Sequence, residues 1–253
     1  MIVEETFNSN NMFLVSVCGM DFAGREHDIM DIKRYIKNWD KVFGTLDGEL
    51  VPPNGRDFAP TGQKAILHQT ILLEDLIKMA RLRLQAQDRL GIQIAGEVGL
   101  GLGVFAGDMI GIGDQVRRLS VKALRRVLEK EGSFFKNIKA VICCMPVFKP
   151  RDNYHYFVEG FKGYKGVLPV WILDQDMHSV TRTAAKFFKT SELNPADSHG
   201  VFGEYWQNRG PGTEEKLALT TAGLLVQHHA INGRMVLNPE RYHFIDVAKP
   251  LND

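Results

Sequence analysis

The sequence predicts an α/β fold in which helices cover both faces of a central sheet. Apolar, β-branched runs alternate with segments of helical periodicity along the 253 residues, and this alternation is typical of α/β domains. Residues 139–147 (KAVICCMPV) are continuously apolar, as are strands that a parallel sheet buries on both faces. With 44% hydrophobic and 24% charged residues, the chain is expected to form one domain with a full core.

The first part of the chain contains a strand, two helices and a loop. Residues 12–20 (MFLVSVCGM) predict a buried strand that ends at Gly19. Apolar side chains recur at steps of three and four over residues 26–43 and again over residues 71–90, and this spacing predicts two amphipathic helices. Residues 45–62 between them are rich in Gly, Pro and Asp, so we expect a loop or excursion there.

A glycine-rich connection follows the next strand. Residues 91–98 (GIQIAGEV) predict this strand, and seven glycines fall within residues 96–113, here called the glycine loop. Asp114 is expected to cap the helix that runs to about residue 131. A strand, a glycine-rich loop and a helix N-terminus together form a common phosphate-binding arrangement.

The second half of the chain continues the alternation. Residues 149–166 are polar and aromatic, and we expect a second excursion there. The remaining predicted elements are a strand at 167–176, a helix at 177–189, a long loop at 193–212, a helix at 213–229 and a short strand at 241–247.

The net charge and the cysteine content argue against several classes of partner and site. The formal net charge is +1, with no block of like charges, so we expect neither a nucleic-acid partner nor a membrane partner. The start of the chain lacks a signal-peptide pattern, and no apolar run is long enough to span a bilayer. Cys18, Cys143 and Cys144 have no metal-binding spacing, which indicates reduced core thiols and no metal. We therefore expect a cytoplasmic protein, and export as an effector stays open.

Two familiar nucleotide loops fit the glycine loop poorly. A P-loop requires Gly-Lys followed by Ser or Thr, and this tripeptide does not occur in the sequence. A dinucleotide-binding turn is approximated by Gly101-Leu-Gly103-Val-Phe-Ala106. That motif needs an acid at the end of the next strand, and here the strand ends with Cys-Cys-Met-Pro.

Residues 71–146 resemble the second half of a macrodomain. In that family a helix leads through a short turn into a strand, and a loop of the form G-x-G-[IV]-[FY]-[AG]-[GY] follows. The resemblance implies that the amides of this loop hold the diphosphate and distal ribose of ADP-ribose. The matching residues are Gly101, Gly103, Val104, Phe105, Ala106 and Gly107. Upstream, residues 15–22 (VSVCGMDF) resemble another strand of the family. Asp21 follows Gly19 at the end of this strand, and open α/β sheets bind ligands at that edge, so Asp21 is a candidate ligand contact.

The other half of the macrodomain pattern stands near the C-terminus. Residues 193–203 (LNPADSHGVFG) and 210–215 (GPGTEE) resemble the first half of the family, moved behind the second half. A circular permutation accounts for this order. The resemblance implies a single permuted macrodomain-like domain, a three-layer α/β/α sandwich with a mixed, mostly parallel sheet. The tandem glutamates also resemble the poly(ADP-ribose) glycohydrolase branch, although the Gln that precedes them in that branch is missing.

The resemblance assigns chemistry to the C-terminal residues. Hydrolysis of an ADP-ribosyl bond passes through an oxocarbenium-like state, and a carboxylic acid protonates the leaving group. Adjacent helical side chains diverge by about 100°, so one of Glu214 and Glu215 is expected to face the ribose. Asp197 is expected to orient the ribose or to act as the acid. The implied ligand contacts in this region are Asn194, Trp206 and Gly212.

Several alternatives stay open at the level of sequence. The glycine loop can be a plain strand-to-helix turn, and Glu214 and Glu215 can be ordinary helix-dipole partners. Asn194-Pro195 can be a turn without a ligand. The expected partner is ADP-ribose or an ADP-ribosylated protein, with no cofactor, and the oligomeric state is undecided. A reader that binds ADP-ribose without cleaving it, or an NAD-dependent oxidoreductase, are the alternative functions.

Overall fold

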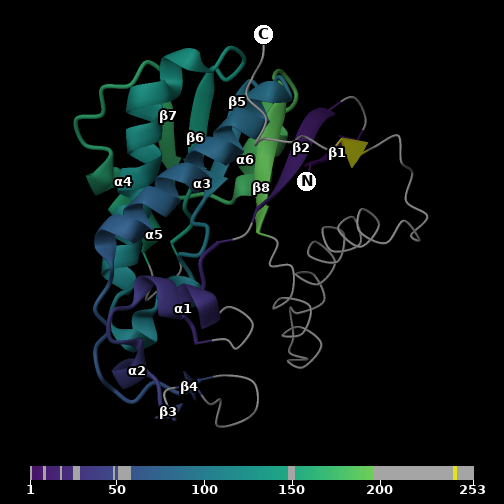
Figure 1. Cartoon of the computed structure of the whole chain (residues 1–253). Helices are drawn as coiled ribbons and strands as arrows, with labels where there is room; N and C mark the ends of the chain where they lie inside the picture. Colours follow the sequence, from purple (N-terminus) through teal and green to yellow (C-terminus); the bar gives the residue numbers. More distant parts are fainter. Residues whose placement is uncertain are drawn as a thin grey trace.

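The computed structural model describes residues 2–7, 10–17, 19–24, 29–47, 49–50, 58–147, 152–195 and 242–243. Its main feature is a seven-stranded sheet with the strand order β7-β6-β5-β8-β2-β1-β9 (Figure 1). Strands β7, β6, β5, β8 and β2 are parallel, and β1 and β9 are antiparallel to their neighbours. The predicted α/β class is confirmed. The strands are β1 (Ile2–Phe7), β2 (Asn10–Val17), β5 (Ile94–Val98), β6 (Ala140–Cys144), β7 (Val170–Leu173), β8 (Thr190–Pro195) and β9 (Tyr242–His243).

Helices pack against both faces of the parallel strands. Alternate residues of a strand point to opposite faces. Val141 and Cys143 accordingly join the main core with helices α3 and α4, whereas Ile142 and Cys144 pack with apolar residues of α6. The helices are α1 (Ile29–Tyr35), α2 (Trp39–Val42), α3 (Gln69–Arg89), α4 (Gly113–Glu131), α5 (Asn153–Gly160) and α6 (Met177–Ala184), with short 3-10 turns η2 (Val104–Ala106), η3 (Asp108–Ile110) and η4 (Gly132–Phe134).

Strand β6 explains the continuously apolar run. All five of its residues are buried, because helices cover both of its faces. Cys143 and Cys144 are buried free thiols, which confirms that these two cysteines belong to the core. Burial raises the pKa of the Cys144 thiol to about 12.

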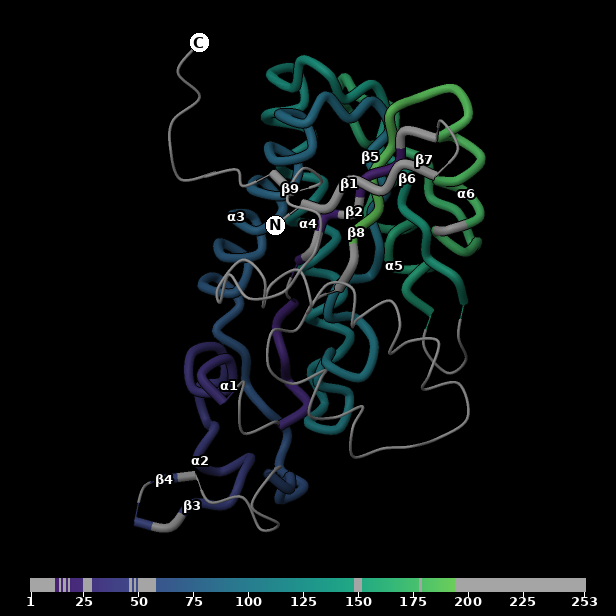
Figure 2. Tube along the Cα trace, turned by 90° about the vertical axis from the view of Figure 1, so that its right-hand side faces the viewer, coloured from purple at the N-terminus to yellow at the C-terminus, as the bar shows by residue number. Residues whose placement is uncertain are grey.

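The helix predicted over residues 26–43 is broken into α1 and α2. The chain leaves the helical path after Tyr35, where the Lys37 amide donates to the Ile66 carbonyl at 2.8 Å and the His68 amide donates to Tyr35 at 2.8 Å. A small hairpin, β3 (Thr45–Leu46) and β4 (Glu49–Leu50), follows α2. Together with α1 and α2 it lies beyond the carboxyl ends of the parallel strands (Figures 1 and 2).

Strand β8 was missed because its sequence is polar. We expected residues 177–189 to be a helix and the segment from 193 to be a loop. The structure instead ends α6 at Ala184 and places β8 between β5 and β2. The Ser191 hydroxyl donates to Gln87 Oε1 at 2.8 Å, and the Thr181 hydroxyl donates to Glu192 Oε1. These hydrogen bonds allow polar side chains to be buried at the centre of the sheet.

Helix α5 replaces the expected second excursion. Its Phe157, together with Phe161 just after it, is buried in the main core. The aromatic residues of this segment therefore serve the core of the domain. The predicted helix at 213–229 lies outside the described residues, and the predicted final strand is represented by β9.

Candidate functional site

The carboxyl edge of the sheet brings the motif-bearing segments together. Strands β2, β5 and β8 are neighbours and run parallel, so residues 19–24, the glycine loop and Asn194 all lie at one edge. The ladder between β5 and β8 ends after Ala95–Ser191, whereas β5 and β6 stay paired to Val98–Cys144. The two central strands therefore diverge towards the edge where α/β sheets bind ligands.

The backbone conformation requires glycine at several positions of the loop. Gly101, Gly107 and Gly111 have φ values of +69°, +81° and +73°, a region that L side chains rarely adopt. A Cβ at Gly107 would lie 2.6 Å from Cγ1 of Ile112, and a Cβ at Gly101 would lie 3.0 Å from the Met20 carbonyl oxygen. These two glycines therefore shape the loop, whatever the loop binds.

The segment after β2 supports the glycine loop. A Cβ at Gly19 would lie 3.0 Å from the Gly101 nitrogen, so the two backbones are in close contact. The Phe22 amide donates to the Phe105 carbonyl at 2.9 Å. Two predicted motifs, VSVCGMDF and the glycine loop, thus pack directly on each other.

The first half of the glycine loop presents unpartnered backbone donors. Within the described chain, the amides of Gly101, Gly103, Val104 and Phe105 donate no hydrogen bond to another protein group. A Cβ at Gly103 would meet no atom of the described residues within 4 Å, and Val104 is 50% exposed. Successive amides without protein partners are a candidate site for an anion.

The N-terminus of α4 is already occupied by a carboxylate. A Cβ at Gly113 would collide with Asp108 Oδ1, and Asp108 accepts from Arg117 at 2.7 and 2.8 Å. A negative group at this helix end is stabilised by the helix dipole. The predicted cap was wrong: Ile112 precedes the helix, and Asp114 lies in its first turn, where it accepts from the Tyr156 hydroxyl.

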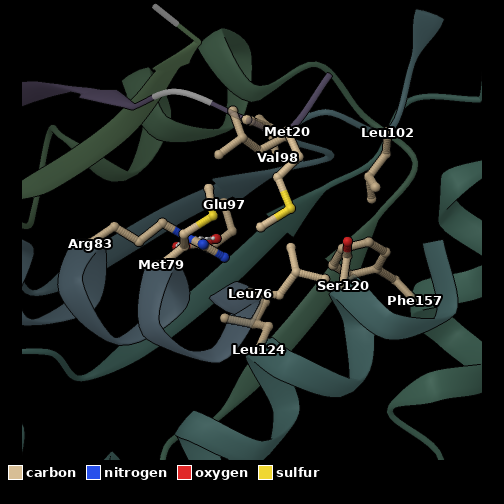
Figure 3. Close-up of a pocket in the computed structure, with 12 residues that line it drawn as sticks. Met20, Leu76, Met79, Arg83, Glu97, Val98, Leu102, Ser120, Leu124 and Phe157 are labelled. Atoms are coloured by element: carbon tan, nitrogen blue, oxygen red, sulfur yellow. Dashed lines mark hydrogen bonds and ion pairs between the residues drawn. The ribbon is translucent and has the colours of Figure 1, made fainter. Parts of the chain in front are cut away.

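A buried ion pair lies beneath the loop (Figure 3). Glu97 of β5 is 1% exposed and accepts from Arg83 Nε at 2.8 and 3.1 Å. Burial raises the pKa of Glu97 above its ordinary value, and Arg83 opposes that shift. The sequence signal that could have revealed Glu97 is an acid within the apolar strand that leads into the glycine loop.

A small cavity adjoins this ion pair. Its volume is about 30 Å³, and Gly19, Leu100, Ser120 and Phe157 are among its lining residues. This is room for one or two water molecules and far too little for a nucleotide. This cavity itself therefore cannot hold a nucleotide.

The other predicted site residues stand as follows. Asp21 is 5% exposed, and its carboxylate accepts from the Ala23 amide at 2.5 Å; its ligand role stays a prediction. The backbone of Asn194 pairs with Ser16 near the carboxyl end of β8. The predicted residues outside the described part of the chain are Asp197, Trp206, Gly212, Glu214 and Glu215.

Two further carboxylates at this edge have structural roles. Asp174 accepts from the Val147 amide at 2.8 Å. Asp176 caps α6 by accepting from the Ser179 amide at 3.0 Å. Both support backbone at the edge of the sheet, so neither is needed as a ligand contact to explain its position.

No family model and no curated protein matches the chain. Over the described ranges, no helix has the length and apolar character needed to cross a bilayer. The same residues contain no cluster of three or more His, Cys, Asp or Glu side chains that could hold a metal ion.

Proposed function

We propose that this protein binds ADP-ribose at the carboxyl edge of its sheet and hydrolyses an ADP-ribosyl bond. The glycine loop takes the diphosphate. The observation that carries the proposal is the group of unpartnered amides at Gly101 and Gly103–Phe105, within the sequence G-L-G-V-F-A-G that resembles the macrodomain loop. Backbone amides are well suited to a diphosphate because their donors are fixed before the ligand arrives.

The strand order supports the permuted macrodomain arrangement. A permutation in which residues 193–215 supply the missing first half requires their strand to return beside the glycine loop. Strand β8 lies between β5 and β2, the two strands that precede the other two motifs. The proposed fold is a three-layer α/β/α sandwich, with α3 and α4 on one side of the sheet and α6 on the other.

The proposed chemistry places the reaction between the loop and residues 194–215. Asn194 holds a ribose hydroxyl, and one carboxyl group among Asp197, Glu214 and Glu215 protonates the leaving group at C1″ of the distal ribose. Trp206 excludes water from that acid, and Gly212 lets the backbone approach the ligand. The substrate is an ADP-ribosylated protein or a related adduct.

A dinucleotide-dependent oxidoreductase is the second candidate. The order β7-β6-β5-β8 matches the 3-2-1-4 order of a dinucleotide-binding half, with a glycine loop after its first strand. Two observations disfavour it. The N-terminus of α4 holds the Asp108 carboxylate where the cofactor pyrophosphate would sit. Strand β6 ends at Cys144 and is followed by Met145 and Pro146, with no acid for a ribose.

Calorimetric titration of ADP-ribose against three variants of one residue tests the proposal. Gly103 is the position to change, because a side chain there enters open space, whereas one at Gly107 would disrupt the loop. Gly103→Ala, Gly103→Gln and Gly103→Glu share any backbone cost of a Cβ. Gln and Glu are nearly equal in size, so their difference reports repulsion between the carboxylate and the diphosphate.

We expect wild type to bind ADP-ribose more tightly than NAD, AMP or ATP. Gly103→Glu should weaken binding by about tenfold more than Gly103→Gln. Equal affinities for the Gln and Glu variants would show that the diphosphate does not bind at this part of the loop. Tighter binding of NAD by wild type would favour the oxidoreductase.

A second assay separates cleavage from binding alone. Release of ADP-ribose from a modified protein is measured for wild type, Asp197→Asn, Glu214→Gln and Glu215→Gln. One of these variants should lose release while it still binds ADP-ribose. Binding without release by wild type would identify a reader.

A further inference from the structure

Arg117 is the most extensively bonded side chain beneath the glycine loop. It projects from the second turn of α4 and is 4% exposed. Its Nη atoms donate to the two carboxylate oxygens of Asp108 at 2.8 and 2.7 Å, and its Nε donates to Asn153 Oδ1 at 3.1 Å. A longer hydrogen bond, at 3.4 Å, joins Nη2 to the Leu102 carbonyl oxygen.

These partners lie on either side of the unpartnered amides of Gly103–Phe105. Leu102 immediately precedes Gly103, and Asp108 follows Gly107. One guanidinium therefore fixes both ends of the segment that contains η2. Because the C=O and N–H of a trans peptide unit point in opposite directions, a Leu102 carbonyl turned towards Arg117 directs the Gly103 amide away from the buried side.

The third partner links the loop to α5. Asn153 begins α5, and Tyr156 of the same helix places its ring 5.9 Å from the Arg117 guanidinium carbon. The planar guanidinium suits this task, because its donors hold a fixed geometry towards several acceptors at once. The arginine, Asp108 and Asn153 form what we call the loop clamp.

Charge alone is a poor explanation for the loop clamp. The positive charge of Arg117 is offset by Asp108, with which it forms a two-pronged ion pair. Such a neutral pair attracts a distant anion only weakly. Its geometry, in contrast, determines where the amides of the loop point.

We propose that Arg117 is the positioning residue of the phosphate cradle: through Asp108, Asn153 and the Leu102 carbonyl it holds the loop amides ready for a diphosphate. This inference rests on the proposed function. It assigns the affinity for a diphosphate to a side chain that does not touch the ligand.

Two variants that change the charge of the Arg117–Asp108 pair in opposite directions distinguish an effect of loop positioning on ligand affinity from an effect of charge. Arg117→Met removes a positive charge, and Asp108→Asn removes a negative one, while both weaken the loop clamp. If positioning dominates, both variants weaken ADP-ribose binding, by about tenfold or more. If charge dominates, Asp108→Asn tightens binding, and this result would overturn the proposal.

Arg81→Met is the matched control. Arg81 forms an equally close two-pronged pair with Glu131, from 2.7 to 2.9 Å. Glu131 is the last residue of α4, about 27 Å along the helix from its first residue. This variant should lose stability yet bind ADP-ribose within about twofold of wild type. An equal loss of affinity in Arg81→Met and Arg117→Met would show that Arg117 acts only through global stability.

Hydrogen exchange of the ligand-free protein tests the loop clamp independently. The Leu102, Ala106 and Ile112 amides are hydrogen-bonded within the loop, so their exchange reports its order. Exchange should accelerate by about tenfold in Arg117→Met and Asp108→Asn, but not in Arg81→Met. If wild type fails to bind ADP-ribose, the proposed function fails, and this measurement still decides whether Arg117 orders the loop. Unchanged exchange would overturn the inference.

Discussion

Replacing Gly107 with alanine should destabilise the protein far more than the same change at Gly163. Both glycines have positive φ, +81° and +67°. A Cβ at Gly107 would lie 2.6 and 2.9 Å from two atoms of Ile112 and 3.0 Å from Phe22 Cβ, whereas one at Gly163 would meet nothing within 4 Å. The pair therefore shares the backbone penalty and differs in steric overlap.

The two contributions can be estimated separately. A left-handed conformation costs an L residue about 1–2 kcal/mol, and this is the whole cost expected at Gly163. Forcing an additional atom into a filled core costs about 1–3 kcal/mol more, and this applies only at Gly107. The free energy of unfolding should thus fall by about 2–5 kcal/mol for Gly107→Ala.

Urea-induced unfolding, followed by far-ultraviolet circular dichroism, measures both differences. Equal m-values would show that the variants expose the same surface on unfolding, so that midpoint shifts report stability. If Gly107→Ala lost no more stability than Gly163→Ala, this result would contradict the tight packing of Gly107 against Ile112 and Phe22. Gly103 was chosen as the binding probe because a side chain at Gly107 would disrupt the loop, so that reason would then be lost.

Three further predictions concern the stability of the domain. Because burial raises the native pKa of Glu97 above 4.5, the folded state binds its proton more tightly than the unfolded state, so the stability of wild type relative to Glu97→Gln should fall as pH rises above about 4.5. Urea midpoints across a pH series measure this, and a constant difference would contradict the buried carboxyl. Asp88→Ala should cost about 1–3 kcal/mol, because its carboxylate accepts three amides of residues 136–138; thermal unfolding measures the loss, and a change below about 0.5 kcal/mol would rule out that role. Leu84 is fully buried, so Leu84→Ala should cost about 2–5 kcal/mol in urea unfolding, and a near-neutral result would place Leu84 outside the core.

Apolar periodicity predicted the elements whose burial is apolar. It located α3, α4 and β6 to within a few residues, because their core faces consist of aliphatic side chains. It missed β8, whose buried Ser191 and Glu192 find hydrogen-bond partners on other elements. Such partners come from residues distant in sequence, and no local pattern indicates them.

Prediction of the candidate site was uneven for a similar reason. Glycine spacing identified the loop, since a chain needs bare backbone where φ is positive or where two backbones meet. The loop clamp was not predicted, because it requires knowing that Arg117, Asp108 and Asn153 meet beneath one loop. The position of Asp114 in the sequence predicted a cap for α4. In the structure Asp114 lies in the first turn, and the Asp108 carboxylate lies against Gly113 at the start of the helix.

The two halves of the glycine loop differ in how many of their amides are hydrogen-bonded within the loop. In its second half the amides of Ile110, Gly111 and Ile112 donate to carbonyls of the same segment, whereas those of Gly107 and Met109 have no partner in the described chain. In residues 101–105, among the described contacts, only the Leu102 amide donates such a hydrogen bond. Amides without protein partners in the described chain, beside an open position, therefore support the proposal that an anion binds this part of the loop.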